Sequence, residues 1–198
     1  MANVFLVSDT HFGHAGVCRF LRDDGTKLRP WDDPNDMDEA MIERWNSVVK
    51  PRDKVYHLGD VVINRKALKI LGLLNGDKVL IKGNHDIFKL EDYTPYFRDI
   101  RGYHVMSGMI LSHIPVHESN LYRFGTNIHG HTHSNRVMKT VTVQESSPYD
   151  PRPYDVKKQV IDPRYHCVCV EQTDFAPISF EDVKLRIKAE GGDISFKS

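Results

Sequence analysis

Five short motifs rich in aspartate, asparagine and histidine are spread over the first two thirds of the chain. They are Asp9-Thr10-His11, Gly59-Asp60, Gly83-Asn84-His85-Asp86, Ser112-His113 and Gly130-His131-Thr132-His133. Residues two apart in an extended segment point to the same side, so the Asp9 carboxylate and the His11 imidazole can converge on one cation. His131 and His133 have the same spacing. Together the motifs indicate a metal site.

The order of these motifs resembles the calcineurin-like metallophosphoesterase superfamily over about residues 8 to 133. Within it, the chain is most similar to the small, uncapped bacterial and phage-type phosphoesterases. The resemblance implies a dinuclear site in which Asp60 bridges two cations. The first cation would be held by Asp9, His11, Asp60 and His133, and the second by Asp60, Asn84, His113 and His131.

Two divalent transition-metal ions are the expected cofactors, because mixed nitrogen and oxygen ligation suits them better than Ca²⁺. We expect manganese, with iron, zinc, nickel and cobalt as alternatives. Two cations about 3.5 to 4 Å apart need a shared anion, and such a pair can activate a bridging hydroxide for attack on phosphorus. Two carboxylates and four neutral imidazoles leave the site positive, so an anionic phosphate is the natural substrate.

His85 is left without a metal to bind. By resemblance, it donates a proton to the leaving oxygen or contacts a nonbridging oxygen, and imidazole can do either near pH 7. One position departs from the pattern of the phosphoprotein phosphatases, whose second motif carries an orienting aspartate where this chain has Ile63. The departure argues against a protein phosphatase and leaves open what positions His85. His14 is a candidate substrate contact, with a structural role as the alternative.

Other chemically capable side chains have structural interpretations. His57 lies within an apolar run and is expected in the core, whereas His117 and His129 are expected near the ligands or in solvent. Cys167 and Cys169 share a strand face at a spacing that is wrong for zinc. Four basic residues follow the first motif and are expected on a solvated face, although they can attract phosphate: Arg19, Arg22, Lys27 and Arg29.

The function that follows is hydrolysis of small phosphodiesters, such as cyclic nucleotides or nucleic-acid ends. A phosphomonoesterase is the alternative within the same class. From a different class, the chain could be an inactive relative that serves as a protein-binding scaffold, although such proteins tend to lose ligands that this sequence retains. A structural zinc module fits poorly because its ligands cluster locally.

Short apolar runs at Val4–Val7, Val55–Leu58 and Val79–Ile81 each precede a motif and predict strands buried on both faces. Asp36–Val49 has helical periodicity, with Asp36 as the expected N-cap, and a second helix is expected after Asn64. This alternation predicts an α/β domain. The resemblance implies a four-layer αββα sandwich with two mixed β-sheets flanked by helices.

The second half is expected to contain more strands, at Val105–His113, Thr126–His129 and His166–Val170, and a closing helix at Ser179–Lys188. The stretch Gln144–Pro163 contains four prolines and no clear period. We expect it to be a loop or insertion.

The composition fits one domain over residues 1–198, with 27 basic and 27 acidic side chains and a hydrophobic fraction of 40%. The lack of a basic excess argues against gripping long duplex DNA, so nucleic acid is expected only as a substrate. The sequence has no apolar run of bilayer length and no signal-peptide pattern, which predicts a cytoplasmic protein without membrane association. Its three cysteines are expected to be reduced. The oligomeric state stays open.

Overall fold

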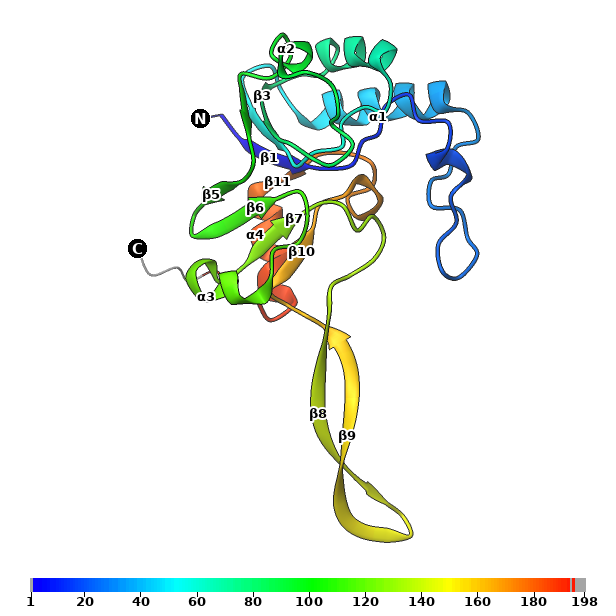
Figure 1. Cartoon of the computed structure of the whole chain (residues 1–198), viewed down its shortest axis with the longest axis vertical. Coiled ribbons are helices and arrows are strands. Elements are labelled where there is room, and N and C mark those ends of the chain that lie inside the picture. Colours follow the sequence, from blue (N-terminus) through cyan, green and yellow to red (C-terminus); the bar gives the residue numbers. More distant parts are fainter. Residues whose placement is uncertain (1, 193, 195–198) are drawn as a thin grey trace.

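The computed structural model describes residues 2–192 and 194, in which helices and two β-sheets form a mixed α/β structure (Figure 1). The first sheet has the strand order β11-β1-β2-β3-β4. Its strands β1 to β4 run parallel, and β11 is antiparallel to β1. The strands are β1 (Val4–Val7), β2 (Lys54–His57), β3 (Asp77–Ile81), β4 (Asp99–Arg101) and β11 (Ile178–Ser179).

The second sheet has the order β10-β7-β6-β5, in which only the β5 to β6 pairing is antiparallel. Its strands are β5 (His104–Met106), β6 (Met109–Ser112), β7 (Asn127–His129) and β10 (Tyr165–Cys167). Every strand predicted from the apolar runs is therefore present. Leu6, Val79 and Ile81 of the first sheet share one buried cluster with Leu111 and Ile128 of the second, so the two sheets pack face to face.

The opposite face of the first sheet is covered by α1 (Pro34–Val48) and the 3₁₀ helix η2 (Arg65–Gly72). α1 begins earlier than predicted, because the carboxylate of Asp33 accepts the Asn35 N–H at 2.7 Å and is the N-cap in place of Asp36. Pro34 fits this start because the first turn needs no N–H from it. η2 begins at its predicted position, with the Asn64 side chain accepting the Ala67 N–H at 3.0 Å.

The remaining helices are short except for α4. The closing helix α4 (Phe180–Ala189) is capped by Ser179 as predicted and packs into the cluster between the sheets. α3 (Leu121–Phe124) places Leu121 in a small cluster with Ile110 and Tyr165 of the second sheet. The other short helices are η1 (Val17–Arg19), α2 (Leu90–Tyr93), η3 (Glu118–Asn120) and η4 (Val170–Gln172).

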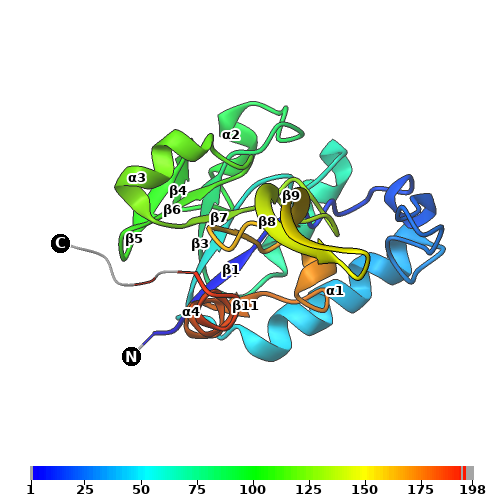
Figure 2. The same ribbon diagram turned by 90° about the horizontal axis from the view of Figure 1, so that it is seen from below.

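The stretch Gln144–Pro163, which we expected to be a loop or insertion, is mostly strand, so the loop alternative is wrong. β8 (Met138–Ser147) and β9 (Asp150–Ile161) form an antiparallel hairpin that projects from the two sheets (Figures 1 and 2). Prolines suggested a loop because they lack an N–H. In a ribbon of only two strands, however, alternate N–H groups face solvent, so a proline there loses no ladder bond.

None of the helices among the described residues is both long enough and apolar enough to cross a bilayer.

Candidate metal centre

The five motifs follow the carboxyl ends of five strands: β1, β2 and β3 in the first sheet, and β6 and β7 in the second. Their side chains meet there in two groups. Within each group the ligand atoms lie within 4.8 Å of one another, and each group can hold a metal ion. The first group is Asp9, His11 and His133, and the second is Asp60, His113 and His131. The structure therefore brings together six of the seven predicted ligands, divided as the resemblance implies.

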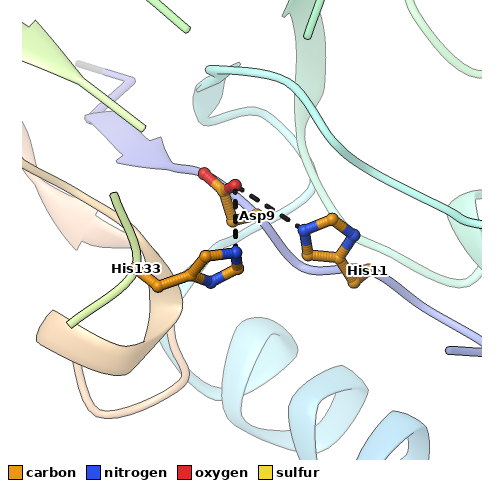
Figure 3. Close-up of side chains that lie close together, drawn as sticks. All are labelled: Asp9, His11 and His133. Carbon is orange, nitrogen blue, oxygen red and sulfur yellow. Dashed lines mark ion pairs between the residues drawn. The ribbon is translucent and has the colours of Figure 1, made fainter. Parts of the chain in front are cut away.

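In the first group, both imidazoles are directed at one carboxylate (Figure 3). Asp9 Oδ1 lies 3.6 Å from His11 Nε2 and 3.9 Å from His133 Nε2. This oxygen is buried and has no hydrogen-bond partner among the described residues. A buried carboxylate oxygen without a donor is costly, so its position facing two imidazole nitrogens fits a bound cation.

The other Asp9 oxygen is fully used by the protein. Asp9 Oδ2 accepts the Ser8 hydroxyl at 2.6 Å, the His131 N–H at 2.8 Å and the Cys169 thiol at 3.1 Å. These three donors fix the carboxylate plane, so Oδ1 is held facing the histidines.

In the second group, His113 has a fixed orientation. Its Nδ1 donates to the Leu58 carbonyl at 2.7 Å, which leaves Nε2 directed at the site. Nε2 lies 3.4 Å from Asp60 Oδ2 and 2.8 Å from Asn84 Oδ1. Asn84, the seventh predicted ligand, thus joins this group through an oxygen, and the His131 ring lies 5.1 Å from the His113 ring.

Asp60 connects the two groups. Its Oδ2 lies 3.8 Å from His11 Nε2 of the first group as well as 3.4 Å from His113 Nε2 of the second. Its Oδ1 accepts the backbone N–H of His85 at 2.8 Å. One carboxylate oxygen therefore faces histidines from both groups, while the other is held by the protein.

The backbone at the site is strained. Five of the predicted ligands have left-handed φ values between 49° and 68°: Asp9, His11, Asp60, His131 and His133. Such a conformation costs a non-glycine residue about 1–3 kcal/mol, and such residues concentrate at functional sites. The extended backbone that we expected for Asp9 and His11 is therefore wrong. Their side chains converge through a left-handed turn and not through strand alternation.

Asp86 holds the second and third motifs together. Its Oδ2 accepts the N–H groups of Asp60 and Gly83, each at 2.8 Å, and its Oδ1 accepts that of Val61 at 3.0 Å. Because both oxygens are engaged by backbone, Asp86 does not orient the His85 side chain. Glycine is required at position 83, since a Cβ there would lie 2.2 Å from Asp60 Oδ1.

Neighbouring charges at the site shift the pKa values of Asp9 and His113. Burial would raise the pKa of Asp9, but His11, His113 and His133 hold that pKa well below its usual range. Burial lowers the pKa of His113, yet the Asp60 carboxylate more than offsets this and raises it. A site that stabilises protons on imidazole beside ionised carboxylate will also attract a cation, which displaces those protons.

The rings of His85 and His14 both lie near that of His11. Their ring centres are 5.6 Å and 5.7 Å from that of His11. His85 is exposed, whereas His14 is half-buried. Burial, with the charge of His11, lowers the pKa of His14 to about 4, so it is neutral at pH 7.

The side chains with structural interpretations behave mostly as predicted. His57 is fully buried, 3.0 Å from the Thr10 hydroxyl, and burial lowers its pKa to about 3. His129 is buried and His117 is exposed. Cys167 and Cys169 are buried free thiols, and Cys169 also contacts Asp9.

The prediction that Arg29 lies on a solvated face is wrong. Its side chain is fully buried and pairs with the equally buried Glu171, whose Oε1 lies 2.7 Å from Arg29 Nη2 and 3.1 Å from His133 Nδ1. Sequence reasoning missed Glu171 altogether. No local signal could have found it, because it lies 142 residues after Arg29 and in no motif.

No family model matches the chain. It is 38% identical over 143 residues to the uncharacterized protein MJ1445 of Methanocaldococcus jannaschii, covering 69% of this chain and 73% of that protein. It is 32% identical over 178 residues to the gene 66 protein of Mycobacterium phage D29, and this match covers 72% of this chain and 84% of the phage protein. A crystal structure of AQ665, a protein of unknown function from Aquifex aeolicus, matches 93% of this chain and 99% of its own with a TM-score of 0.61 and 26% identity.

Proposed function

The chain belongs to one family with the archaeal protein MJ1445 and the phage gene 66 protein, and we propose that it is a dinuclear metal-dependent phosphoesterase that prefers small phosphodiesters. One observation carries this proposal. Asp60 Oδ2 faces histidines of two separate ligand groups, at 3.4 Å from His113 and 3.8 Å from His11. A carboxylate so placed suits a bridge between two cations, and paired cations are a common device for hydrolysing phosphate esters.

The packing supports the corresponding fold assignment. Helices α1 and η2 cover one sheet, the two sheets share a core, and α3 packs on the far face of the second sheet. We assign this succession to the four-layer αββα sandwich of the calcineurin-like metallophosphoesterases.

Asp9, His11 and His133 would hold one cation, Asn84, His113 and His131 the other, and Asp60 both. When bound, two such ions neutralise charge on the phosphoryl oxygens and make water a stronger nucleophile. Manganese is our first choice, with iron, zinc, nickel or cobalt as alternatives, because the donors are a mixture of imidazole nitrogen and carboxylate or amide oxygen.

His85 is assigned to the leaving group. Its backbone N–H is bonded to Asp60 Oδ1 at 2.8 Å, which fixes the residue beside the bridging carboxylate, while its side chain is exposed. From there the imidazole can donate a proton to the departing oxygen. His14 is assigned to substrate contact. Its lowered pKa makes it a neutral hydrogen-bonding group at pH 7 and not a second positive charge.

A groove beside the second ligand group supports an open, uncapped site. It has a volume of about 360 Å³ and is lined by Lys82, Asn84, His113 and Ile114 among others. Lys82 supplies a positive charge for phosphate, and Ile114 supplies an apolar surface for the organic part of a diester. Such an open site admits small phosphodiesters.

Hydrolysis of bis-p-nitrophenyl phosphate and p-nitrophenyl phosphate by the Mn²⁺-loaded protein tests the proposal. We expect two metal ions per chain and faster cleavage of the diester. Asp60→Asn should lose both metals and the activity, because both ligand groups share this carboxylate. Asp162→Asn is the matched control, since Asp162 is a buried carboxylate bonded to Arg164 instead of to any ligand. Absence of turnover with Mn²⁺, Ni²⁺, Co²⁺ and Zn²⁺ would overturn the proposal.

A further inference from the structure

A buried ion pair stands directly behind one of the two ligand groups. The side chains of Arg29 and Glu171 are both 0% exposed. Arg29 Nε donates to Glu171 Oε1 at 2.8 Å, and Arg29 Nη2 forms an ion pair with the same oxygen at 2.7 Å. The same oxygen accepts from His133 Nδ1 at 3.1 Å. Glu171 therefore fixes which nitrogen of His133 carries the proton, and Nε2 is left free to face Asp9.

The guanidinium of Arg29 is also tied to the first motif. It donates to the Thr10 carbonyl at 2.7 Å and to the Asp9 carbonyl at 2.6 Å. These carbonyls belong to the left-handed turn that presents Asp9 and His11. One buried side chain thus connects the backbone of the first motif to the carboxylate that orients the last ligand.

Among the described residues, no carboxylate outside the ligand set bonds to a histidine ring of the second ligand group. His113 Nδ1 donates to the Leu58 backbone carbonyl, which is a neutral acceptor. A carboxylate behind a histidine ligand fixes the ring and makes its free nitrogen a stronger donor to metal than a neutral acceptor does. Because Arg29 neutralises Glu171 overall, the expected effect is that of a strong, fixed acceptor and not of an added net charge.

We propose that Glu171 is a positioning residue that makes the group of Asp9, His11 and His133 the tighter of the two cation sites, and that Arg29 holds Glu171 against His133. This inference rests on the proposed function for the presence of the two cations. The inference adds to the proposed function that the two sites have unequal affinities, and it names the residues that cause the difference.

Calorimetric titration with Mn²⁺ alone tests the assignment. In an Asn84→Ala background, which removes a ligand of the second group, we expect Glu171→Gln to weaken Mn²⁺ binding about 10- to 100-fold, the usual effect of losing such an outer partner. When His133 is also replaced by alanine, Glu171→Gln should cause no further loss, because its effect passes through that ring. A role limited to holding the fold would weaken binding equally with and without His133.

Glu171→Gln leaves Arg29 buried without an anion, so folding is checked by circular dichroism. If that variant does not fold, Arg29→Gln combined with Glu171→Gln leaves no buried charge unpaired and carries the same expectation. Asp162→Asn breaks the separate Arg164 pair and should leave Mn²⁺ affinity unchanged.

Unchanged affinity in Glu171→Gln, or an equal loss in Asp162→Asn, overturns the inference. Hydrolysis is not measured in the titration, so the two proposals fail separately. An intact titration in a protein without phosphoesterase activity refutes only the proposed function, and an unchanged titration in an active enzyme refutes only the role of Glu171.

Discussion

At the scale of single residues, Asp9 and Asp60 use their two carboxylate oxygens in the same way. Each gives one carboxylate oxygen to donors of the protein and turns the other toward imidazole nitrogens. The bonded oxygen fixes the direction of the free one, so the protein itself holds the ligand atoms in position. Preorganisation of this kind lowers the cost of binding.

The variant His85→Ala tests whether the His85 ring serves proton transfer and not metal binding. No predicted ligand depends on the His85 ring, so the variant should keep its metal content while hydrolysis slows about 10²-fold or more, the usual scale for a general acid. Metal analysis alongside the diester assay checks this. His117→Ala, which removes an exposed histidine bonded to Ser119, should change neither quantity. Parallel loss of metal and activity in His85→Ala would show that the ring has a different role.

Gly130→Ala tests how closely the backbone must approach Asp9. The added Cβ would lie 2.0 Å from Ser8 Oγ and 2.5 Å from Asp9 Oδ2, so these atoms would have to move. We expect a loss of about 1–3 kcal/mol in the free energy of unfolding, as for other overpacked sites, together with weaker metal binding. Gly102→Ala is the matched control, because its Cβ meets nothing within 4 Å. Equal stability of the two variants would contradict the crowding seen at Gly130.

At the scale of elements, the site depends on contacts between segments that carry no ligand and those that do. α1 presents Asp38 to the turn after the first motif, where its two oxygens lie 2.9 and 3.1 Å from the Gly13 N–H. Burial raises the pKa of Asp38 to about 6. The helix thus holds the loop that carries His14, with a carboxylate that resists ionisation.

Asp38 should make stability depend on pH in a known direction. Its pKa is higher in the folded protein than in the unfolded chain, so the folded state keeps a proton between about pH 4 and 6 that the unfolded state has lost. Its contribution to stability is therefore greatest below this window and falls as the pH rises through it. Asp38→Asn removes this fall and can still accept the Gly13 N–H.

Urea unfolding at pH 5 and pH 7.5, with a chelator present throughout, measures the effect. The stability of Asp38→Asn relative to the natural sequence should increase from the lower to the higher pH. A constant difference between the two proteins would mean that Asp38 ionises normally in the folded state.

At the scale of the whole molecule, the β8–β9 hairpin stands apart from the layers that build the site (Figure 1). None of its residues whose side chains are described is buried. Its strands are held by their own pairing, such as Val143 opposite Val156, and by the ion pair of Lys158 with Glu145. No hairpin residue whose side chain is described belongs to either ligand group.

Replacing residues 140–159 by an Asn-Gly turn between Lys139 and Val160, which face each other in the register, should spare the body of the protein. We expect Tm to change by less than about 4 °C, equivalent to roughly 1 kcal/mol or less for a chain of this size, and the metal content to stay the same. Thermal unfolding and metal analysis check both. Loss of metal on shortening would show that the hairpin supports the last motif.

The sequence alone indicated a metal site and determined the approximate positions of the strands. Apolar runs and the polar residues that follow them are local features, and parallel strands bring their carboxyl ends to a common edge. The predicted strands and the closing helix with its Ser179 cap could be predicted for this reason, whereas the division of the ligands into two groups followed from the family resemblance. Local composition misled where it had a second meaning, as with the prolines of the hairpin.

The tertiary structure decided what each ligand atom faces. Three features depend on segments that are far apart in the chain. They are the left-handed turns at Asp9 and Asp60, the hydrogen bonds from the backbone of two motifs to Asp86, and the burial of Arg29 against Glu171. Such contacts leave no periodicity in the sequence, because they depend on where the loops pack once both sheets are formed. A basic residue in a polar loop looks solvated until the fold places a carboxylate beside it.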